Sequence, residues 1–176
     1  MNVARRIQKT FIPVVAVAAL ALPANALACG NVHADANRTS LKQVDVSTVC
    51  LLNTERRKRG LRPLHLSKKL SRAARRHSHS MAYHHYFAHG DFVGRIRSTH
   101  YLAGYRSWIV GENIAWGSQQ FGTPAAIVDA WMHSPPHRAN ILNRSFRQIG
   151  IGVSRGAPLP AIPDGVTYTT DFGKRD

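Results

Sequence analysis

Two short blocks of sequence decide the fold: GENIAWG at residues 111–117 and WMHSPPHRANIL at residues 131–142. The first places one carboxylate, Glu112, among apolar residues and glycines, and the second places His137 directly after two prolines. Because proline interrupts a helix and restricts the residue before it, we expect a helix to stop just before His137. We expect Glu112 and His137 each to lie on a constrained irregular segment. A further histidine, His89, stands upstream in YFAHG at residues 86–90. We expect the rest of the chain to bring these three side chains to one site.

The first 28 residues are predicted to be a secretory signal. Basic residues precede an apolar run from Phe11 to Leu22, and Ala26-Leu27-Ala28 fits the small-residue cleavage pattern. The run is too short to span a membrane. It also lacks the polar face of the alternative, a cytoplasmic amphipathic helix. We therefore expect a secreted, extracellular chain without a transmembrane segment after cleavage, in which residues 29–44 form an extended lead-in and residues 45–176 one domain.

The chain is strongly basic. Its formal charge is +15, and removal of Arg5, Arg6 and Lys9 with the signal leaves +12. Such a charge attracts anionic polymers and surfaces, and export excludes nucleic acid as the expected partner. Cell-wall polymers or lipid head groups remain, unless the basic surface is merely solvated. The residues predicted to carry this binding follow one face of a helix, and they are Lys68, Arg72, Arg75 and Arg76.

Only two cysteines are present, Cys29 and Cys50. In an oxidising compartment an even pair predicts one disulfide, which at this spacing stabilises the fold by about 3 kcal/mol. The alternative is lipidation of Cys29, but Leu27 stands in the wrong place for a lipoprotein signal.

Periodicity and capping residues predict a mixed α+β domain. We expect a first helix from Asp45 or Ser47 to about Arg59, a second from Ser67 to about Tyr83, and a third that begins at Thr123-Pro124 and ends near His133. Short helices are expected at residues 92–99 and 138–142. Residues 146–154 and 166–172 alternate like strands and are predicted to pair as a hairpin with a long loop. Gly150 and Gly152 would leave one face of the first strand bare, so that a helix packs closely on it.

These blocks, in this order, resemble the CAP superfamily of cysteine-rich secretory proteins, antigen 5 and pathogenesis-related proteins, and most of all its small bacterial members. The resemblance runs from Val49 to Gly173. It implies a three-layer α-β-α sandwich with a central antiparallel sheet, and we expect a monomer. Asn53 and Arg56 match a family pattern in the first helix that supports the fold.

The resemblance also implies a central cleft with two histidines and two glutamates, reported to bind divalent cations in some members. His89, Glu112 and His137 match three of the four, and Ser134 stands where the second glutamate is expected. Two imidazoles and one carboxylate suit zinc or another divalent cation with one open position. Asn113, Ser134 and Asn140 are expected to support the cleft. The alternatives are that Glu112 braces a tight loop and that His137 caps a short helix.

Two functions follow from these residues. The first is a secreted binding module whose cleft holds a metal, a small ligand or a glycan without turnover. The second is a metal-dependent hydrolase in which zinc lowers the pKa of a bound water and a further group acts as general base. The chain has no His-Glu-x-x-His motif and no Gly-x-Ser-x-Gly elbow. A binding module rather than an enzyme is therefore expected.

Overall fold

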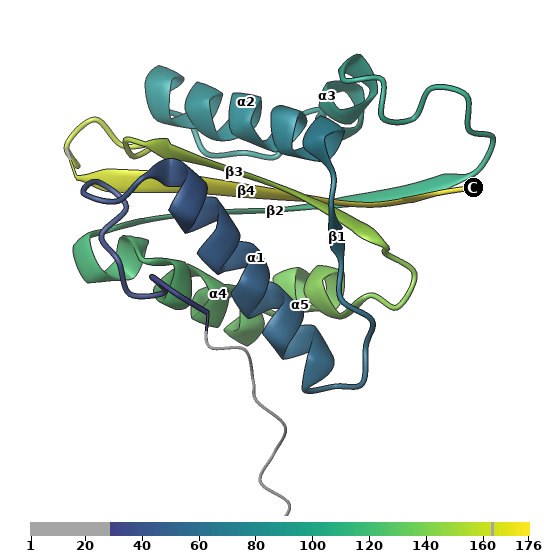
Figure 1. Ribbon diagram of the computed structural model, residues 1–176. Coiled ribbons are helices and arrows are strands. Elements are labelled where there is room, and N and C mark those ends of the chain that lie inside the picture. The colour runs from purple at the N-terminus through teal and green to yellow at the C-terminus, as the bar shows by residue number, and fades with distance from the viewer. Residues whose placement is uncertain (1–28, 163) are drawn as a thin grey trace, which may run out of the picture.

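The computed structural model describes residues 29–162 and 164–176, so the predicted signal segment lies outside the described residues. In the described part, five α-helices pack on a four-stranded sheet of order β1-β3-β4-β2 (Figure 1). Strands β2 (Trp108–Ser118), β3 (Gln148–Arg155) and β4 (Gly165–Arg175) are antiparallel, and β1 (His65–Leu66) joins β3 in parallel. The expected α+β sandwich is present. The sheet was expected to be antiparallel but is mixed, because the two-residue strand β1 pairs with β3 in parallel.

Helices α2 (Lys68–His84) and α3 (Phe92–Ser98) cover one face of the sheet (Figure 1). As predicted, Ser67 caps α2, and the apolar side of that helix, including Leu70 and Met81, is buried. The helix lies so close to β3 that a Cβ at Gly150 or Gly152 would come within 2.1 Å of helix backbone atoms. As predicted from the two glycines, one face of β3 lacks side chains there, and α2 packs directly on it.

The other face carries α1 (Leu41–Arg57), α4 (Pro124–His133) and α5 (Pro135–Leu142) (Figure 1). Helix α1 begins before the predicted caps, because the side chain of Ser40 accepts a hydrogen bond from the amide of Gln43. Ser47 lies inside the helix, and its hydroxyl faces the carbonyl of Gln43 one turn earlier at 2.8 Å. The predicted disulfide between Cys29 and Cys50 is present and ties the start of the described chain to α1.

Arg56 and Asn53 brace the end of α1. The buried guanidinium of Arg56 donates to the carbonyls of Ile141 at 2.6 Å, Asn143 at 3.0 Å and Arg62 at 2.9 Å. Asn53 exchanges two hydrogen bonds with the backbone of Leu64. These bonds hold α5 and the turn before β1 in place, the fold-supporting role that the family pattern implied.

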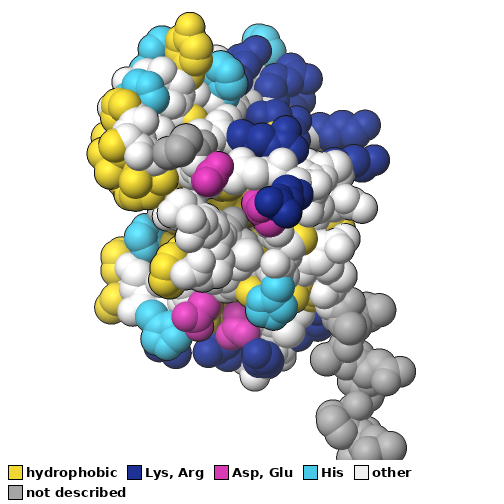
Figure 2. All heavy atoms as spheres, turned by 90° about the vertical axis from the view of Figure 1, so that its left-hand side faces the viewer, with side chains coloured by type: hydrophobic (Ala, Val, Ile, Leu, Met, Phe, Trp, Pro, Cys, Tyr) yellow, Lys and Arg dark blue, Asp and Glu magenta, His cyan; other side chains and the backbone are white. Residues whose placement is uncertain are grey.

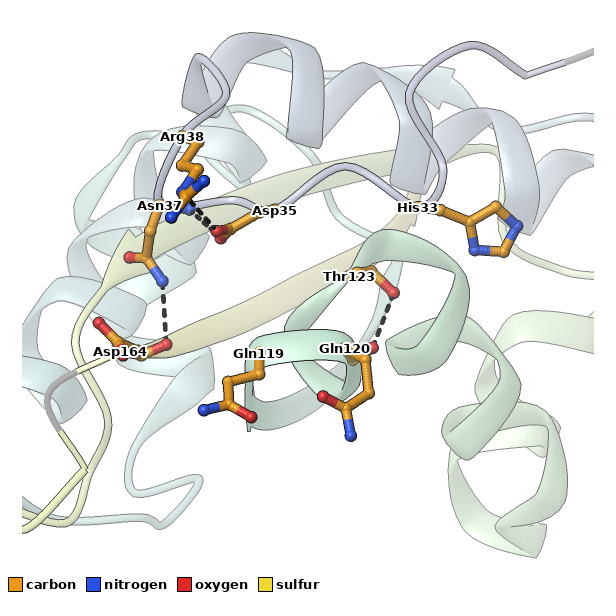
Figure 3. A pocket seen from close by; sticks show the side chains of 8 residues that line it. All are labelled: His33, Asp35, Asn37, Arg38, Gln119, Gln120, Thr123 and Asp164. Atoms are coloured by element: carbon orange, nitrogen blue, oxygen red, sulfur yellow. Dashed lines mark hydrogen bonds and ion pairs between the residues drawn. The ribbon is translucent and has the colours of Figure 1, made fainter.

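Residues 29–44 were expected to form an extended lead-in, but they form turns up to Ser40 and then begin α1. The turns lie beside the 3-10 helix η1 (Gln119–Gly122) and the start of α4. The amide of Ala125 donates to the carbonyl of Val32, and Asn37 donates to the carbonyl of Asp164 at 2.9 Å (Figure 3). Figure 3 shows the polar hollow of about 550 Å³ that these segments enclose. Its carboxylate Asp35 already accepts from the amide of Asn37.

Candidate functional site

The block GENIAWG was expected to be irregular. In the structure it forms the middle of β2. Residues alternate in direction along a strand, so Glu112 faces the α2–α3 layer and Asn113 the α5 layer. Within the described sheet β2 pairs only with β4 and is an edge. Its outer carbonyls at Glu112 and Ile114 accept hydrogen bonds from Asn140 and Trp131, each at 3.1 Å. Side chains of α4 and α5 therefore satisfy this edge, as exposed strands require.

The two prolines begin a helix instead of preventing one. Ser134 ends α4, and Pro135 and Pro136 occupy the first positions of α5, where no backbone donor is needed. His137 consequently lies inside α5 rather than before it. Asn113 donates to the carbonyl of His137 at 3.0 Å and accepts from Asn140 at 2.9 Å. Asn113 and Asn140 were expected to support the site, and they join β2 to the helix that carries His137.

Glu112 is buried and each of its oxygens has a partner. One oxygen lies 2.8 Å from Nδ1 of His89, and the other accepts from Nη2 of Arg95 at 2.6 Å. The guanidinium so close by stabilises the ionised, acceptor-only form of Glu112. We therefore assign the shared proton to Nδ1 of His89, which leaves a lone pair on Nε2. The side chain of His89 is 49% exposed.

Asp171 lies directly opposite Glu112 on β4 and is only 1% exposed. Neither of its oxygens has a donor among the described residues. Burial, and then the negative charge of Glu112, raise the pKa of Asp171 well above its usual range, while Arg95 acts in the opposite direction. A protonated Asp171 supplies the donor that a hydrogen bond to Glu112 requires. The pair therefore carries one negative charge, which Arg95 balances.

His137 is half-buried, and its Nδ1 lies 2.8 Å from the hydroxyl of Ser134. Burial lowers the pKa of His137, and electrostatic repulsion between its imidazolium form and the ring of His89 lowers it further. The two imidazoles thus influence each other, although His89 approaches from the α2–α3 side of β2 and His137 from α5. Ser134, where the family's second glutamate was expected, contacts His137 through this bond.

Residues 49–170 match the CAP family, the cysteine-rich secretory proteins. The chain belongs to this family. It is 39% identical over 119 residues to YkwD of Bacillus subtilis, covering 65% of this chain and 44% of YkwD. It is 33% identical over 142 residues to the Bacillus subtilis membrane protein YlbC, covering 78% of this chain and 35% of YlbC. The chain therefore spans less than half the length of these two relatives.

Solved structures agree with the CAP fold. An extracellular protein of Bacillus anthracis with an SCP domain is 27% identical, with a TM-score of 0.59, covering 75% of this chain and 42% of its own. An outer surface protein of Borrelia burgdorferi is 20% identical, with a TM-score of 0.60 over 73% of this chain and 90% of its own. The second likeness concerns the fold alone. In the described part of our CAP domain, no helix is long and apolar enough to cross a membrane.

The donor types of His89, Glu112 and His137 suit a divalent cation, but Glu112 is engaged by Arg95 and His89. Among residues 29–162 and 164–176, no group of three His, Cys, Asp or Glu side chains is placed to hold a metal ion. Glu112 would have to release Arg95 or His89 before it could bind a cation. The structure brings His89 into contact with Glu112, and the three-ligand metal site stays a prediction.

Three groups around Glu112 were not expected from the sequence: Arg95, Asp171 and His77, whose Nε2 lies 3.9 Å from the carboxylate. His77 is packed on the apolar side of α2, where its Nε2 also lies 3.0 Å from the carbonyl oxygen of Ala88. Asp171 could have been noticed, because it is the one acidic residue in the predicted strand at residues 166–172. Nothing in the spacing of Arg95 distinguishes it from the many other arginines.

Proposed function

We propose that this CAP domain is a secreted binding module, and that its ligand contacts Nε2 of His89 and Nε2 of His137 at the β2 edge. One observation carries the proposal: each ring has its Nδ1 fixed within the protein, by Glu112 and by Ser134 respectively. Among the described residues neither Nε2 has a hydrogen-bond partner. Both rings are therefore held in one orientation with one nitrogen left for a ligand.

In this proposal Glu112 orients His89 instead of binding the ligand. A carboxylate that accepts the second ring proton of a histidine fixes the tautomer and makes the other nitrogen more basic. A zinc ion or another divalent cation would then be held by two neutral imidazoles, with the remaining donors supplied by the ligand or by water. Two protein ligands give a weaker site than the three or four of typical zinc proteins.

Binding without turnover is favoured over hydrolysis because the only ionised carboxylate of the Glu112–Asp171 pair is already engaged. A general base must be able to take a proton from a water or a substrate. Glu112 faces Arg95 and His89 instead, and Asp171 is only 1% exposed and so out of reach of a substrate.

The basic face of α2 supports a second contact, with anionic cell-wall polymers or lipid head groups. Its members Lys68, Arg72, Arg75 and Arg76 are all exposed. Figure 2 shows Lys and Arg side chains gathered over the upper part of the molecule, where α2 lies in Figure 1. Such binding is screened by salt, so it should weaken as the Debye length falls below about 10 Å. Charge reversal of all four residues should abolish retention on an anionic polymer at low salt, and undiminished retention would refute this contact.

Calorimetric titration with zinc tests the proposed site at His89 and His137. We expect the wild type to bind, and His89→Ala and His137→Ala each to lose binding. The exposed His65, at the opposite edge of the sheet, gives a matched control in His65→Ala, which should bind like the wild type. Affinity should fall as the solution becomes acidic, because protons compete with the metal for the imidazoles. Equal zinc affinity for all four proteins would refute the proposal.

A further inference from the structure

A second candidate site lies at the free edge of the sheet, where β2 begins. The hydrogen bonds at this end of the strand show which backbone groups face outward. The carbonyl of Ser107 accepts from the amide of Asp176, at the end of β4, so the odd-numbered residues of β2 face β4. Backbone groups alternate in direction along an antiparallel strand. The N–H and C=O groups of Trp108, Val110 and Glu112 therefore point away from the sheet.

The side chains that cover this edge do not reach the start of the strand. Those of α5 and α4 satisfy the outward carbonyls of Glu112 and Ile114. Among the described residues, the outward N–H and C=O groups of Trp108 and Val110 have no hydrogen-bond partner. The outward amide of Glu112 has none there either, although this residue is only 5% exposed. Because buried amides are nearly always paired, this row of groups is a template for another strand.

Apolar side chains flank these free backbone groups. Trp108 and Ile109 point to opposite faces of the sheet and are 37% and 38% exposed. Tyr105, in the loop between α3 and β2, is 40% exposed. Contacts between neighbouring side chains stabilise one strand against the next. A strand added at this edge would therefore gain side-chain contacts as well as backbone hydrogen bonds.

The surroundings of this edge are cationic. Arg175 and Lys174 on β4 stand opposite the first two residues of β2, beside the C-terminus in Figure 1. Arg106, just before the strand, is exposed and has no ion pair within the part of the chain that the structure describes. The acid nearby is Asp176, which pairs with Lys174 at 2.5 Å. An added strand would lie about 10 Å from β4, two strand spacings, which is within reach of long cationic side chains.

We propose that the free edge of β2 at residues 108–112 binds an extended, acidic peptide segment of another protein as an additional strand. The outward groups of Trp108 and Val110 supply the backbone hydrogen bonds, and the cations around them select acidic side chains. The charge disfavours a second copy of this chain, because each copy carries a formal charge of +15. The contact uses backbone groups of β2 and does not depend on the zinc site proposed at His89 and His137.

Fluorescence anisotropy tests the inference with a labelled peptide of alternating glutamate and valine, capped at both ends. We expect this peptide to bind the wild type. Val110→Pro should weaken binding by roughly tenfold or more, because proline lacks the outward donor and its ring obstructs an incoming strand. The bonds from β2 to β4 do not use this N–H, and proline is tolerated at such positions of edge strands. The urea midpoint of the variant should therefore stay close to that of the wild type.

Leu66→Pro is the matched control at the opposite edge of the sheet. The amides of His65 and Ser67 donate to the carbonyls of Arg147 and Ile149, so the N–H of Leu66 points away from the sheet. Its side chain is 58% exposed. This variant should bind the peptide within about twofold of the wild type.

Two altered peptides separate the backbone contact from the charge. A peptide N-methylated at every residue cannot donate hydrogen bonds, and a peptide with lysine in place of glutamate reverses the charge. Both should bind the wild type roughly tenfold more weakly or worse. These comparisons need no variant, so they decide the question even if Val110→Pro does not fold.

The inference is overturned if the glutamate–valine peptide does not bind, or if a folded Val110→Pro binds it as tightly as the wild type. Equal losses in Val110→Pro and Leu66→Pro would show an effect on the fold instead of the β2 edge. Equal binding of the N-methylated peptide would show general electrostatic attraction. A dimer in sedimentation that Val110→Pro dissociates would show that a second copy of the chain covers the edge. Zinc binding that persists while peptide binding fails would refute this inference alone.

Discussion

Replacing Gly150 with alanine should separate α2 from the sheet. A Cβ at this position would lie 2.1 Å from the carbonyl carbon of Leu70 and 2.2 Å from the amide nitrogen of Ser71. Ordinary contacts between such atoms are about 3.5–4.0 Å, so the helix must move by more than about 1 Å. The atoms that it meets are backbone atoms, which cannot swing aside as a side chain can. Overpacking of this kind costs about 1–3 kcal/mol, while loss of glycine entropy in a strand returns about 0.5–1 kcal/mol.

We therefore expect Gly150→Ala to lower the free energy of unfolding by about 2 kcal/mol, measured by urea denaturation with the disulfide intact. Gly30→Ala is the matched control, because no atom lies within 4 Å of its Cβ and its φ is not positive. It should change the free energy by less than about 0.5 kcal/mol. A Gly150→Ala variant as stable as the control would refute the close packing of α2 on β3.

Three further predictions concern stability. Replacing both Cys29 and Cys50 with alanine should lower the free energy of unfolding by about 3 kcal/mol, and an unchanged urea midpoint would contradict this. Arg56→Met should cost about 3 kcal/mol or more in the same assay, because buried carbonyls lose their donor; a loss below about 1 kcal/mol would contradict it. Burial raises the pKa of Asp45 to about 6 although Arg75 opposes the shift. The folded state therefore binds the proton more tightly than the unfolded state, and the contribution of Asp45 to stability is lost as pH rises through about 6. Between pH 4 and pH 7, the free energy of unfolding should decline by about 1–3 kcal/mol less in Asp45→Asn than in the wild type. If the free energy of unfolding of the two proteins changes in parallel with pH, the raised pKa of Asp45 is refuted.

Local signals predicted the elements that depend on their own sequence. The Ser67 cap and the apolar side of α2 were sufficient to place that helix, and Thr123-Pro124 was sufficient to place the start of α4. Gly150 and Gly152 even indicated that β3 is packed by a helix. These predictions were correct because a helix cap, an apolar period and a pair of glycines each depend on residues within one turn or one strand.

The elements that depend on tertiary contacts were misread. GENIAWG shows no clear alternation, because β2 presents Glu112 to one layer and Asn113 to the other and both are buried. The strand is recognisable only through β4 and the side chains of α4 and α5 that satisfy its edge. The two prolines were read as a helix stop, although they are equally suited to a first turn.

The same distinction holds for the site. The resemblance was sufficient to select His89, Glu112 and His137, but the role of Glu112 could not be predicted from the sequence. It depends on Arg95, which arrives on α3, and on Asp171, which arrives through strand register. Neither neighbour is close to Glu112 in the sequence, so only the folded chain shows that this carboxylate is engaged.

The central claim is that Glu112 fixes His89 with Nε2 unprotonated and that this nitrogen, together with Nε2 of His137, meets the ligand. Ring-nitrogen NMR of the ¹⁵N-labelled protein near pH 8, before and after addition of zinc, measures it directly. We expect His89 to carry its proton on Nδ1 and the Nε2 signals of both histidines to shift when zinc is added. A His89 proton on Nε2, or zinc binding that leaves both Nε2 signals unchanged, would contradict the claim.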